Sequence, residues 1–308
     1  FFGAGLQQIS ALSFIPEIGF QFDTQVSKRK LNDSEQTEET PDKEKGSGAY
    51  TFTNGLSELP EAIFRKLGHK RVRLECNVSS IKPTDKLYQV HYVDKSGLER
   101  IVETEAVIIA TPAPTALKIA AEALTEAQKK ILGNIQYSSY TTVALFCSSP
   151  IFDKSFDLGV GNKFVFTDLY DGSWVQRAFD RDSSKTNERV LCAHVPDYHP
   201  DNLLDGSSDV ELVGKVIADL GNIFPHAEAN IVGHDVKTTT LAYPVMQPGA
   251  YQNIAKLNDL NQGRVLLAGQ YMIYPTIEAA IESGYLAAIK LDADLGGQNS
   301  AAEQPAQE

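Results

Sequence analysis

The spacing of hydrophobic residues along the first half of the chain predicts strands. Apolar residues at alternating positions predict a strand over 72–83. The same period on both sides of a Lys-Ser-Gly turn predicts a β-hairpin over 88–104. The unbroken apolar run 106–110 is typical of a strand that is covered on both faces.

Amphipathic stretches with capping signals predict helices between these strands. A short strand from Ala49 and a turn at Asn54-Gly55 lead into a helix that begins after Ser57 and ends at Gly68. Further helices, listed by position, are expected over 112–135 (as one or two helices), 209–224 and 276–296.

The middle of the chain predicts an antiparallel sheet. Short apolar-rich segments at close spacing read as strands over 140–147, 164–170, 174–180 and 189–195, and a longer one over 230–246. A last buried strand is expected over 264–269. The fold class is therefore predicted as α/β in the broad sense, a mixed α+β arrangement.

Two polar segments are predicted to be disordered. Residues 23–48 contain almost no large apolar side chain, so they cannot bury enough surface to offset chain entropy. A regulatory or partner-binding loop is the alternative for this segment. The tail 296–308 is predicted to fray, and the apolar segment 1–22 is assigned to the same domain as the antiparallel sheet.

Charge and composition exclude several classes of protein. The net charge of −12 and the pI of about 5.0 argue against a nucleic-acid partner, which requires a basic face. Three scattered cysteines form neither a disulfide framework nor a zinc ribbon, and a cytoplasmic location is expected. No apolar run is long enough to span a membrane; peripheral membrane contact and the oligomeric state stay open. Because the first residue is Phe1, the chain is expected to begin partway through a longer protein.

The most informative segment is the strand, loop and helix over 264–296. Gly269 permits close backbone approach, and the helix start at Thr276 offers N–H groups and a positive dipole end for an anion. Small side chains form one stripe along this helix, at Ala279, Ala280, Ser283, Gly284, Ala287 and Ala288. An ordinary β-α unit with a small-residue packing face is the alternative interpretation.

Segments 51–68, 73–81, 106–114 and 264–288, taken in this order, resemble the flavin-containing amine oxidase superfamily, in particular protoporphyrinogen oxidases and carotenoid desaturases. The resemblance covers 49–295. It implies the C-terminal part of a FAD/NAD(P)-binding domain, over 49–113 and 258–295. This part is interleaved with an antiparallel-sheet substrate domain over 114–257. It also implies an FAD-dependent oxidoreductase that transfers hydride from a substrate C–H or C–N centre to the flavin.

The resemblance also implies a set of cofactor-binding residues. Asn77 and Val78 would contact the adenine, and Ala110, Thr111 and Pro112 would pass near the dinucleotide. Gly269 and Gln270 would lie by the pyrophosphate and the ribityl chain. Thr276, Ile277 and Glu278 would lie near the pyrimidine end of the flavin. The positive helix end beside the flavin would stabilise its anionic reduced form.

Departures from the family pattern narrow the substrate class. The chain contains no G-x-G-x-x-G, and Gln270 stands where the family has an acidic residue. Thr142 stands near the position of the lysine that amine oxidases place beside the flavin. These departures favour a small-molecule, apolar substrate and desaturase-type or oxidase-type chemistry over amine oxidation. Tyr243, Tyr251 and Thr142 are candidates for the substrate cavity, with core packing as the alternative for the two tyrosines.

Other candidate sites are weaker. His194 and His199 flank Asp197, but the sequence supplies no third ligand nearby, so no metal is expected. Trp174 is assigned to a sheet or core, and the absence of G-x-S-x-G argues against a hydrolase. A protein that keeps the flavoprotein fold without cofactor or catalysis, serving binding or interaction, is the alternative function.

Overall fold

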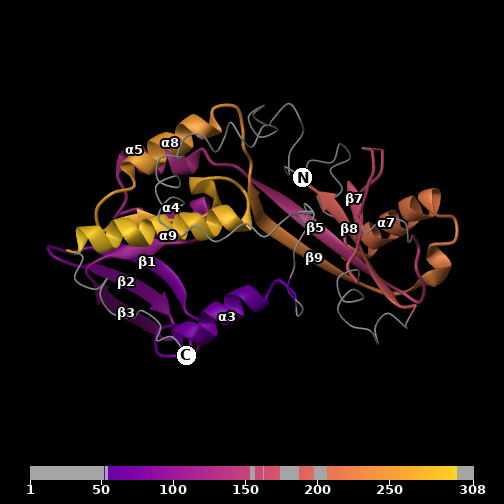
Figure 1. Cartoon of the computed structure of the whole chain (residues 1–308), viewed down its shortest axis with the longest axis horizontal. Helices are drawn as coiled ribbons and strands as arrows, with labels where there is room; N and C mark the ends of the chain where they lie inside the picture. Colours follow the sequence, from indigo (N-terminus) through magenta and orange to yellow (C-terminus); the bar gives the residue numbers. More distant parts are fainter. Residues whose placement is uncertain are drawn as a thin grey trace, which may run out of the picture. The chain divides into compact units, whose positions relative to one another are not determined.

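A computed structural model describes residues 52, 55–152, 157–161, 163–173, 187–197 and 207–296. The chain divides into two compact units (Figure 1). Of the described residues, unit 1 contains 73–137 and 243–296, and unit 2 contains 52–72 and 138–242. The predictions for 1–22, 23–48, 297–308, Trp174 and His199 concern residues outside this description.

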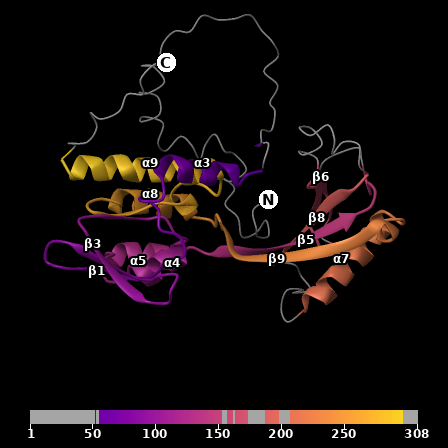
Figure 2. The same cartoon turned by 90° about the horizontal axis from the view of Figure 1, so that it is seen from below.

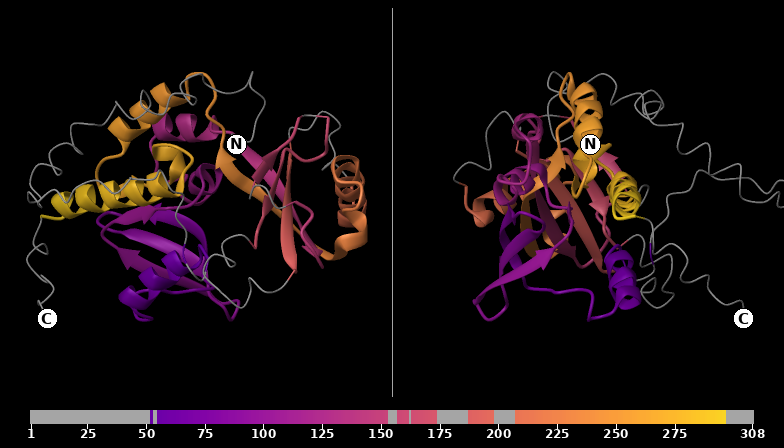
Figure 3. Two further views of the ribbon diagram at one scale, coloured as in Figure 1. Left: turned by 45° about the vertical axis from the view of Figure 1, so that its right-hand side comes forward. Right: turned by 90° about the vertical axis from the view of Figure 1, so that its left-hand side faces the viewer.

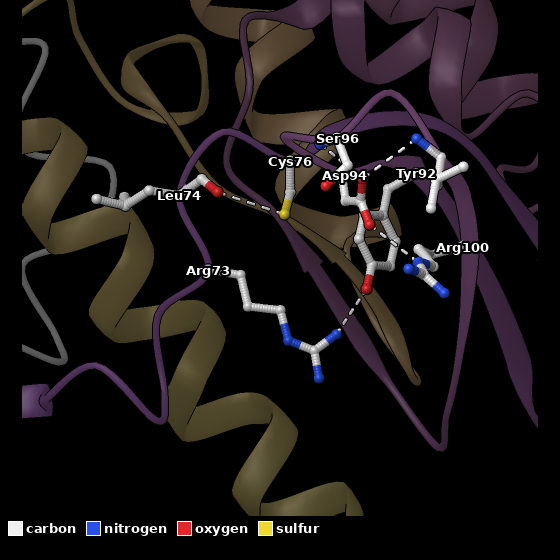
Figure 4. A network of polar contacts seen from close by, with 8 residues as sticks. Arg73, Leu74, Cys76, Tyr92, Asp94, Ser96 and Arg100 are labelled. Atoms are coloured by element: carbon white, nitrogen blue, oxygen red, sulfur yellow. Dashed lines mark hydrogen bonds and ion pairs between the residues drawn. The ribbon is translucent and has the colours of Figure 1, made fainter.

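The first sheet of unit 1 has three antiparallel strands in sequence order, β1 (Asn77–Pro83), β2 (Tyr88–Val93) and β3 (Glu99–Thr104). The predicted hairpin is confirmed, and Gly97 adopts a positive φ of 76° in its turn. The Asp94 carboxylate accepts hydrogen bonds from the backbone N–H of Ser96 and Leu98 and pairs with Arg100 at 2.9 Å (Figure 4). This carboxylate therefore fixes the turn.

The strand predicted over 72–83 is shorter than its hydrophobic pattern indicates. It begins at Asn77, because Glu75 has a left-handed φ of 55°, which interrupts extended backbone. Arg73 lies before this break and donates to the Tyr92 hydroxyl at 2.9 Å, as Figure 4 shows. The alternating residues of 72–76 therefore belong to an irregular segment, which is held by side-chain contacts.

A parallel pair of strands forms the second sheet of unit 1. β4 (Val107–Ile109) pairs in register with β10 (Val265–Leu267). All three residues of β10 are buried, and the strand contributes to two apolar clusters on opposite faces. Leu266 packs with Ala287 of the C-terminal helix, whereas Leu267 packs toward the remaining helices of the unit. The prediction of strands covered on both faces is confirmed.

Four helices cover this pair, namely α4 (Ala113–Ile119), α5 (Glu126–Gly133), α8 (Ala250–Leu260) and α9 (Ile277–Asp294). The segment predicted as one or two helices is two, since α5 starts with its own capping box at Thr125 and Gln128. The Gln128 side chain also donates to the Leu260 carbonyl at 3.2 Å, which joins α5 to the end of α8. A short 3₁₀ helix, η6 (Gln270–Met272), precedes α9.

Unit 2 is built on a five-stranded sheet in the order β6-β7-β8-β5-β9. The strands are β5 (Tyr137–Cys147), β6 (Asp157–Gly159), β7 (Asp168–Asp171), β8 (Arg189–Pro196) and β9 (Ile231–Pro244). Neighbours β6–β7, β7–β8 and β8–β5 pair antiparallel, which confirms the predicted antiparallel sheet.

One face of this sheet packs against α7 (Asp209–Ile223), as Figures 2 and 3 show. Val143 and Val195 of the sheet meet Val216 and Leu220 of the helix in a core that excludes solvent. Cys147 belongs to the same core at 2% exposure, and burial raises the pKa of its thiol to about 11. The interpretation of Cys147 as a small buried hydrophobe is confirmed.

Two short elements complete the description of unit 2. The helix α3 (Glu58–Leu67) follows Ser57 and ends at Gly68, where φ is 77°. A 3₁₀ turn, η5 (Glu228–Asn230), leads into β9. The predicted helix boundaries at Ser57 and Gly68 are therefore confirmed.

The unit boundaries fall at different places from the predicted domain boundaries. The predicted substrate domain spans 114–257, whereas 114–137 and 243–257 belong to compact unit 1. The reason is packing: Leu132 of α5 and Leu257 of α8 share a cluster with Ile109 and Leu267. The chain passes from one unit to the other within β5 and again within β9.

Candidate functional site

The carboxyl ends of β4 and β10 lie side by side in unit 1. The ladder continues one step beyond the strands, where the Ala268 N–H donates to the Ile109 carbonyl at 2.9 Å. The segment Ala110–Pro112 and the turn at Gly269–Gln270 therefore leave the sheet at the same edge. This edge is where open α/β folds bind nucleotide cofactors. Five of the ten predicted cofactor residues thus come together.

The turn after β10 requires a glycine at position 269. Its φ is 143°, a region that side chains rarely adopt, and a Cβ atom would lie 2.8 Å from the Tyr271 ring. Its N–H donates to the Ser283 hydroxyl at 2.8 Å, and that hydroxyl donates to the Ala280 carbonyl at 2.9 Å. Ser283, a member of the predicted small-residue stripe, therefore fastens the turn to α9.

The start of α9 has the donors that an anionic group needs. The Thr276 hydroxyl caps the helix by accepting from the Ala279 N–H at 3.1 Å. The N–H groups of Ile277 and Glu278 have no hydrogen-bond partner among the described residues. Both residues are exposed, so the positive end of an 18-residue helix is accessible.

Thr111 provides a direct indication that this edge is built for a ligand. Its hydroxyl oxygen is buried and has no hydrogen-bond partner among the described residues. A buried hydroxyl without a partner is costly, unless a bound group completes it. The Thr111 hydroxyl and the unpartnered N–H groups at the start of α9 are donors of the kind that a flavin dinucleotide needs, so the residues present fit the group.

Asn77 and Val78 occupy a different sheet from the other candidates. They open β1, where Asn77 is exposed and Val78 packs against the apolar cluster of Ile109 and Leu267. The structure thus brings Val78 to the core beneath the β4–β10 edge. An interaction of Asn77 and Val78 with adenine stays a prediction.

The predicted substrate-cavity residues are divided between the two units. Tyr243, near the end of β9, is 39% exposed, and Tyr251 is half-buried in α8. Both belong to unit 1, whereas Thr142 lies on β5 in unit 2, opposite His194 of β8. Their assignment to a substrate cavity stays a prediction.

Unit 1 contains a pocket that the sequence did not predict. It has a volume of about 50 Å³ and is lined mainly by α8, the end of α5 and the segment Pro244–Pro248. Its walls combine apolar side chains, such as those of Ile131, Val245 and Ile254, with uncharged polar groups from three amide side chains and from Tyr271. Neither Tyr243 nor Tyr251 lines it. The helix α8 forms one wall of this pocket. Because the sequence did not predict this helix, it could not predict the pocket.

The described part of the chain lacks two other kinds of feature. Among those residues, no group of three or more His, Cys, Asp or Glu side chains is arranged to hold a metal ion. No described helix is both long and apolar enough to cross a bilayer.

The fold matches solved structures of oxidases. A protein from Exiguobacterium sp. 255-15 with a provisional assignment as protoporphyrinogen oxidase is 18% identical, with a TM-score of 0.64 over 79% of this chain and 52% of that chain. Cyclohexylamine oxidase from Brevibacterium oxydans IH-35A is 16% identical, with a TM-score of 0.62 over 78% of this chain and 53% of that chain. Putrescine oxidase bound to putrescine is 18% identical, with a TM-score of 0.59 over 77% of this chain and 52% of that chain. The fold of the chain is thus the fold of these oxidase structures.

The sequence assigns the chain to a particular family. The family model for flavin containing amine oxidoreductases matches residues 29–291. The chain belongs to this family, and the predicted superfamily is confirmed. It spans about half the length of the solved structures that it matches.

Proposed function

We propose that the protein is an FAD-dependent oxidoreductase in which the β4–β10 edge and the start of α9 hold part of the cofactor. The observation that carries this proposal is the unpartnered, buried Thr111 hydroxyl beside the Gly269 turn. Family membership supports a flavin as the group that completes it.

Each residue at this edge has a distinct role in the proposed site. Gly269, held by Ser283, lets the Tyr271 ring pack against the turn and so fixes the backbone at this edge. Thr111 supplies a hydroxyl for a polar atom of the cofactor, and Gln270 follows the turn as a neutral side chain. The N–H groups of Ile277 and Glu278 place the positive end of α9 where negative charge develops. When bound, the flavin supplies the two-electron chemistry as a hydride acceptor.

The substrate that we propose is a small, largely apolar molecule oxidised at a C–H or C–N centre. The absence of a lysine at Thr142 supports chemistry of the desaturase or protoporphyrinogen oxidase type over simple amine oxidation. Thr142 is half-buried on β5 and carries no charge.

A cofactor-free binding protein is the competing function, and Gln270 in place of an acidic residue favours it. The two are separated by titrating FAD into protein expressed from its whole coding sequence, while flavin fluorescence and visible absorbance are followed. The oxidoreductase predicts saturable binding with a perturbed flavin spectrum. A protein that stays colourless and leaves the fluorescence of added FAD unchanged would overturn the proposed function.

Replacing Thr111 by valine tests whether its hydroxyl contributes to FAD binding. Without FAD, we expect the free energy of unfolding to stay the same or to rise by about 1 kcal/mol, because an unsatisfied buried hydroxyl becomes a methyl group. With FAD, we expect the Kd to increase about 5–10-fold through loss of one hydrogen bond. Urea unfolding and FAD titration measure the two effects.

The matched control is Thr104→Val. The Thr104 hydroxyl already donates to the Ala106 carbonyl at 3.0 Å, so this variant should lose stability and keep its FAD affinity. If Thr111→Val instead behaves like the control, the Thr111 hydroxyl has a hydrogen-bond partner within the protein, and its assignment to the cofactor site is wrong.

A further inference from the structure

The five-stranded sheet of unit 2 has a second face that the α7 core does not use. Residues that alternate with the buried core positions along β5, β7 and β8 lie on it. We name it the histidine face and define it by Tyr140, Thr142, Asp168, Tyr170, Cys192 and His194. The register places His194 directly opposite both Thr142 and Asp168.

The imidazole of His194 is held in one orientation. Its Nδ1 lies 2.7 Å from Oδ2 of Asp168. The other carboxylate oxygen accepts from the hydroxyls of Thr167 at 3.1 Å and Tyr140 at 3.3 Å. The rings of Tyr140 and Tyr170 each lie 5.0 Å from the imidazole, measured between centroids. Such a ring has little freedom to turn.

Asp168 is ionised and therefore sets the tautomer of the histidine. Burial by itself raises the pKa of this carboxyl, but hydrogen bonds from His194, Thr167 and Tyr140 outweigh burial and lower it. An ionised carboxylate accepts the Nδ1 proton, so the lone pair of the neutral imidazole is on Nε2. Nε2 has no hydrogen-bond partner among the described residues, and the His194 side chain is 24% exposed.

We propose that His194 Nε2 is a proton acceptor for a ligand bound on the histidine face, with Asp168 as its positioning residue. The ligand is a planar, mostly apolar molecule with an N–H or O–H group, because two tyrosine rings flank the only basic nitrogen that the face presents among its described residues. The paired carboxylate stabilises the imidazolium that forms when the proton arrives.

The proposal goes beyond the proposed oxidation and concerns unit 2 alone. The N–H or O–H bond of the ligand breaks, its electron pair stays on the ligand, and its proton goes to Nε2.

Two other titratable groups on this face are neutral around physiological pH. Burial raises the pKa of Tyr170 on β7 and of Cys192 on β8. Tyr140 on β5 contacts the histidine through its ring and Asp168 through its hydroxyl. Asp197, three residues beyond His194, is engaged by the Ser139 N–H at 2.8 Å. Tyr170 and Cys192 keep their protons and therefore do not compete with Nε2 as proton acceptors.

The first experiment measures how reactive the free nitrogen is. Diethyl pyrocarbonate modifies unprotonated imidazole, and peptide mass spectrometry gives the rate at each histidine of the whole chain. We expect His194 to react, and Asp168→Asn to slow it at least about twofold in alkaline buffer, where imidazoles are unprotonated, because loss of the carboxylate at Nδ1 makes Nε2 a weaker nucleophile. His234, exposed on β9, is the internal reference. An unreactive His194, or one that is unaffected by Asp168→Asn, overturns the proposal.

The second experiment observes proton transfer with 4-nitrophenol, a planar aromatic O–H probe whose phenolate absorbs visible light. At a pH where the free probe is mostly protonated, the wild-type protein should raise the phenolate absorbance, and the probe should protect His194 from modification. His194→Gln should abolish the signal, whereas the control His234→Gln should retain it. Unfolding curves verify that each variant folds, and His194→Asn, which keeps a donor for Asp168, is the second variant.

No phenolate signal in the wild type, or an equal signal in His194→Gln, contradicts the assignment. Neither experiment needs the cofactor. A protein that passes both and does not bind FAD therefore contradicts the proposed function alone, whereas one that binds FAD and fails both contradicts this inference alone.

Discussion

Replacing Asn261 by alanine is expected to lower the free energy of unfolding by about 2–5 kcal/mol, because it leaves two buried backbone groups without partners. Asn261 is 3% exposed, and its side-chain amide pairs with the backbone of β10 as a neighbouring strand would. Its side-chain N–H donates to the Leu267 carbonyl at 2.9 Å, and its oxygen accepts from the Leu267 N–H at 2.7 Å. Leu267 is 1% exposed, so water cannot replace either bond.

The neighbouring residue provides the control for this substitution. Gln262 is exposed, and its side chain makes one bond, to the Asp259 carbonyl at 2.8 Å. Gln262→Ala should change stability by less than about 0.5 kcal/mol. Urea or thermal unfolding followed by circular dichroism compares the two. Equal effects would mean that the bonds to β10 contribute little to the stability of unit 1.

Replacing Gly269 by alanine is expected to lower the free energy of unfolding by about 2–4 kcal/mol, through backbone strain and overpacking together. The residue has a φ of 143°, and the new Cβ would lie 2.8 Å from Tyr271, which is itself 2% exposed and cannot move aside freely. The displaced turn would also carry Gly269 N–H away from Ser283. We therefore expect FAD binding to be lost even where the variant folds.

Substitutions at two other glycines distinguish backbone strain from overpacking as the cause of the destabilisation. Gly263 has a φ of 79° with open space around it, so Gly263→Ala measures strain without a clash. Gly284, inside α9, has neither problem, and Gly284→Ala should be neutral or stabilise by about 0.5–1 kcal/mol. If Gly269→Ala is as stable as Gly284→Ala and binds FAD, the close approach that we assign to this turn is not used.

Periodicity predicted the long elements well and the weakly patterned ones poorly. The helix α7 shows a clear apolar stripe and was predicted within about one residue at either end. The helix α8 was not predicted, because only Leu257 is buried along it and its start is Gly249, with a φ of 88°, directly after Pro248. Pro-Gly indicates a turn in sequence, and here the turn leads into a helix.

The β4–β10 edge and the histidine face differ in how well their residue contacts could be predicted from the sequence. The Gly269 turn and the start of α9 are contiguous, so their juxtaposition could be predicted from residue order. The partner of His194 could not be, since Asp168 is joined to it only by the register of two strands. Sequence proximity pointed to Asp197, which instead binds a backbone N–H of β5.

The pairing of β4 with β10 has a consequence for biosynthesis. Residues 107–109 leave the ribosome long before 265–267, and all of the unit 2 sheet is made between them. Until the later strand arrives, Ile109 and its apolar neighbours have no partner strand, and loop closure over this separation is slow. Unit 2 can therefore reach its native contacts while unit 1 is still incomplete. We expect nascent chains halted after β9 to protect the five-stranded sheet from proteolysis and to expose 107–133 to a chaperone.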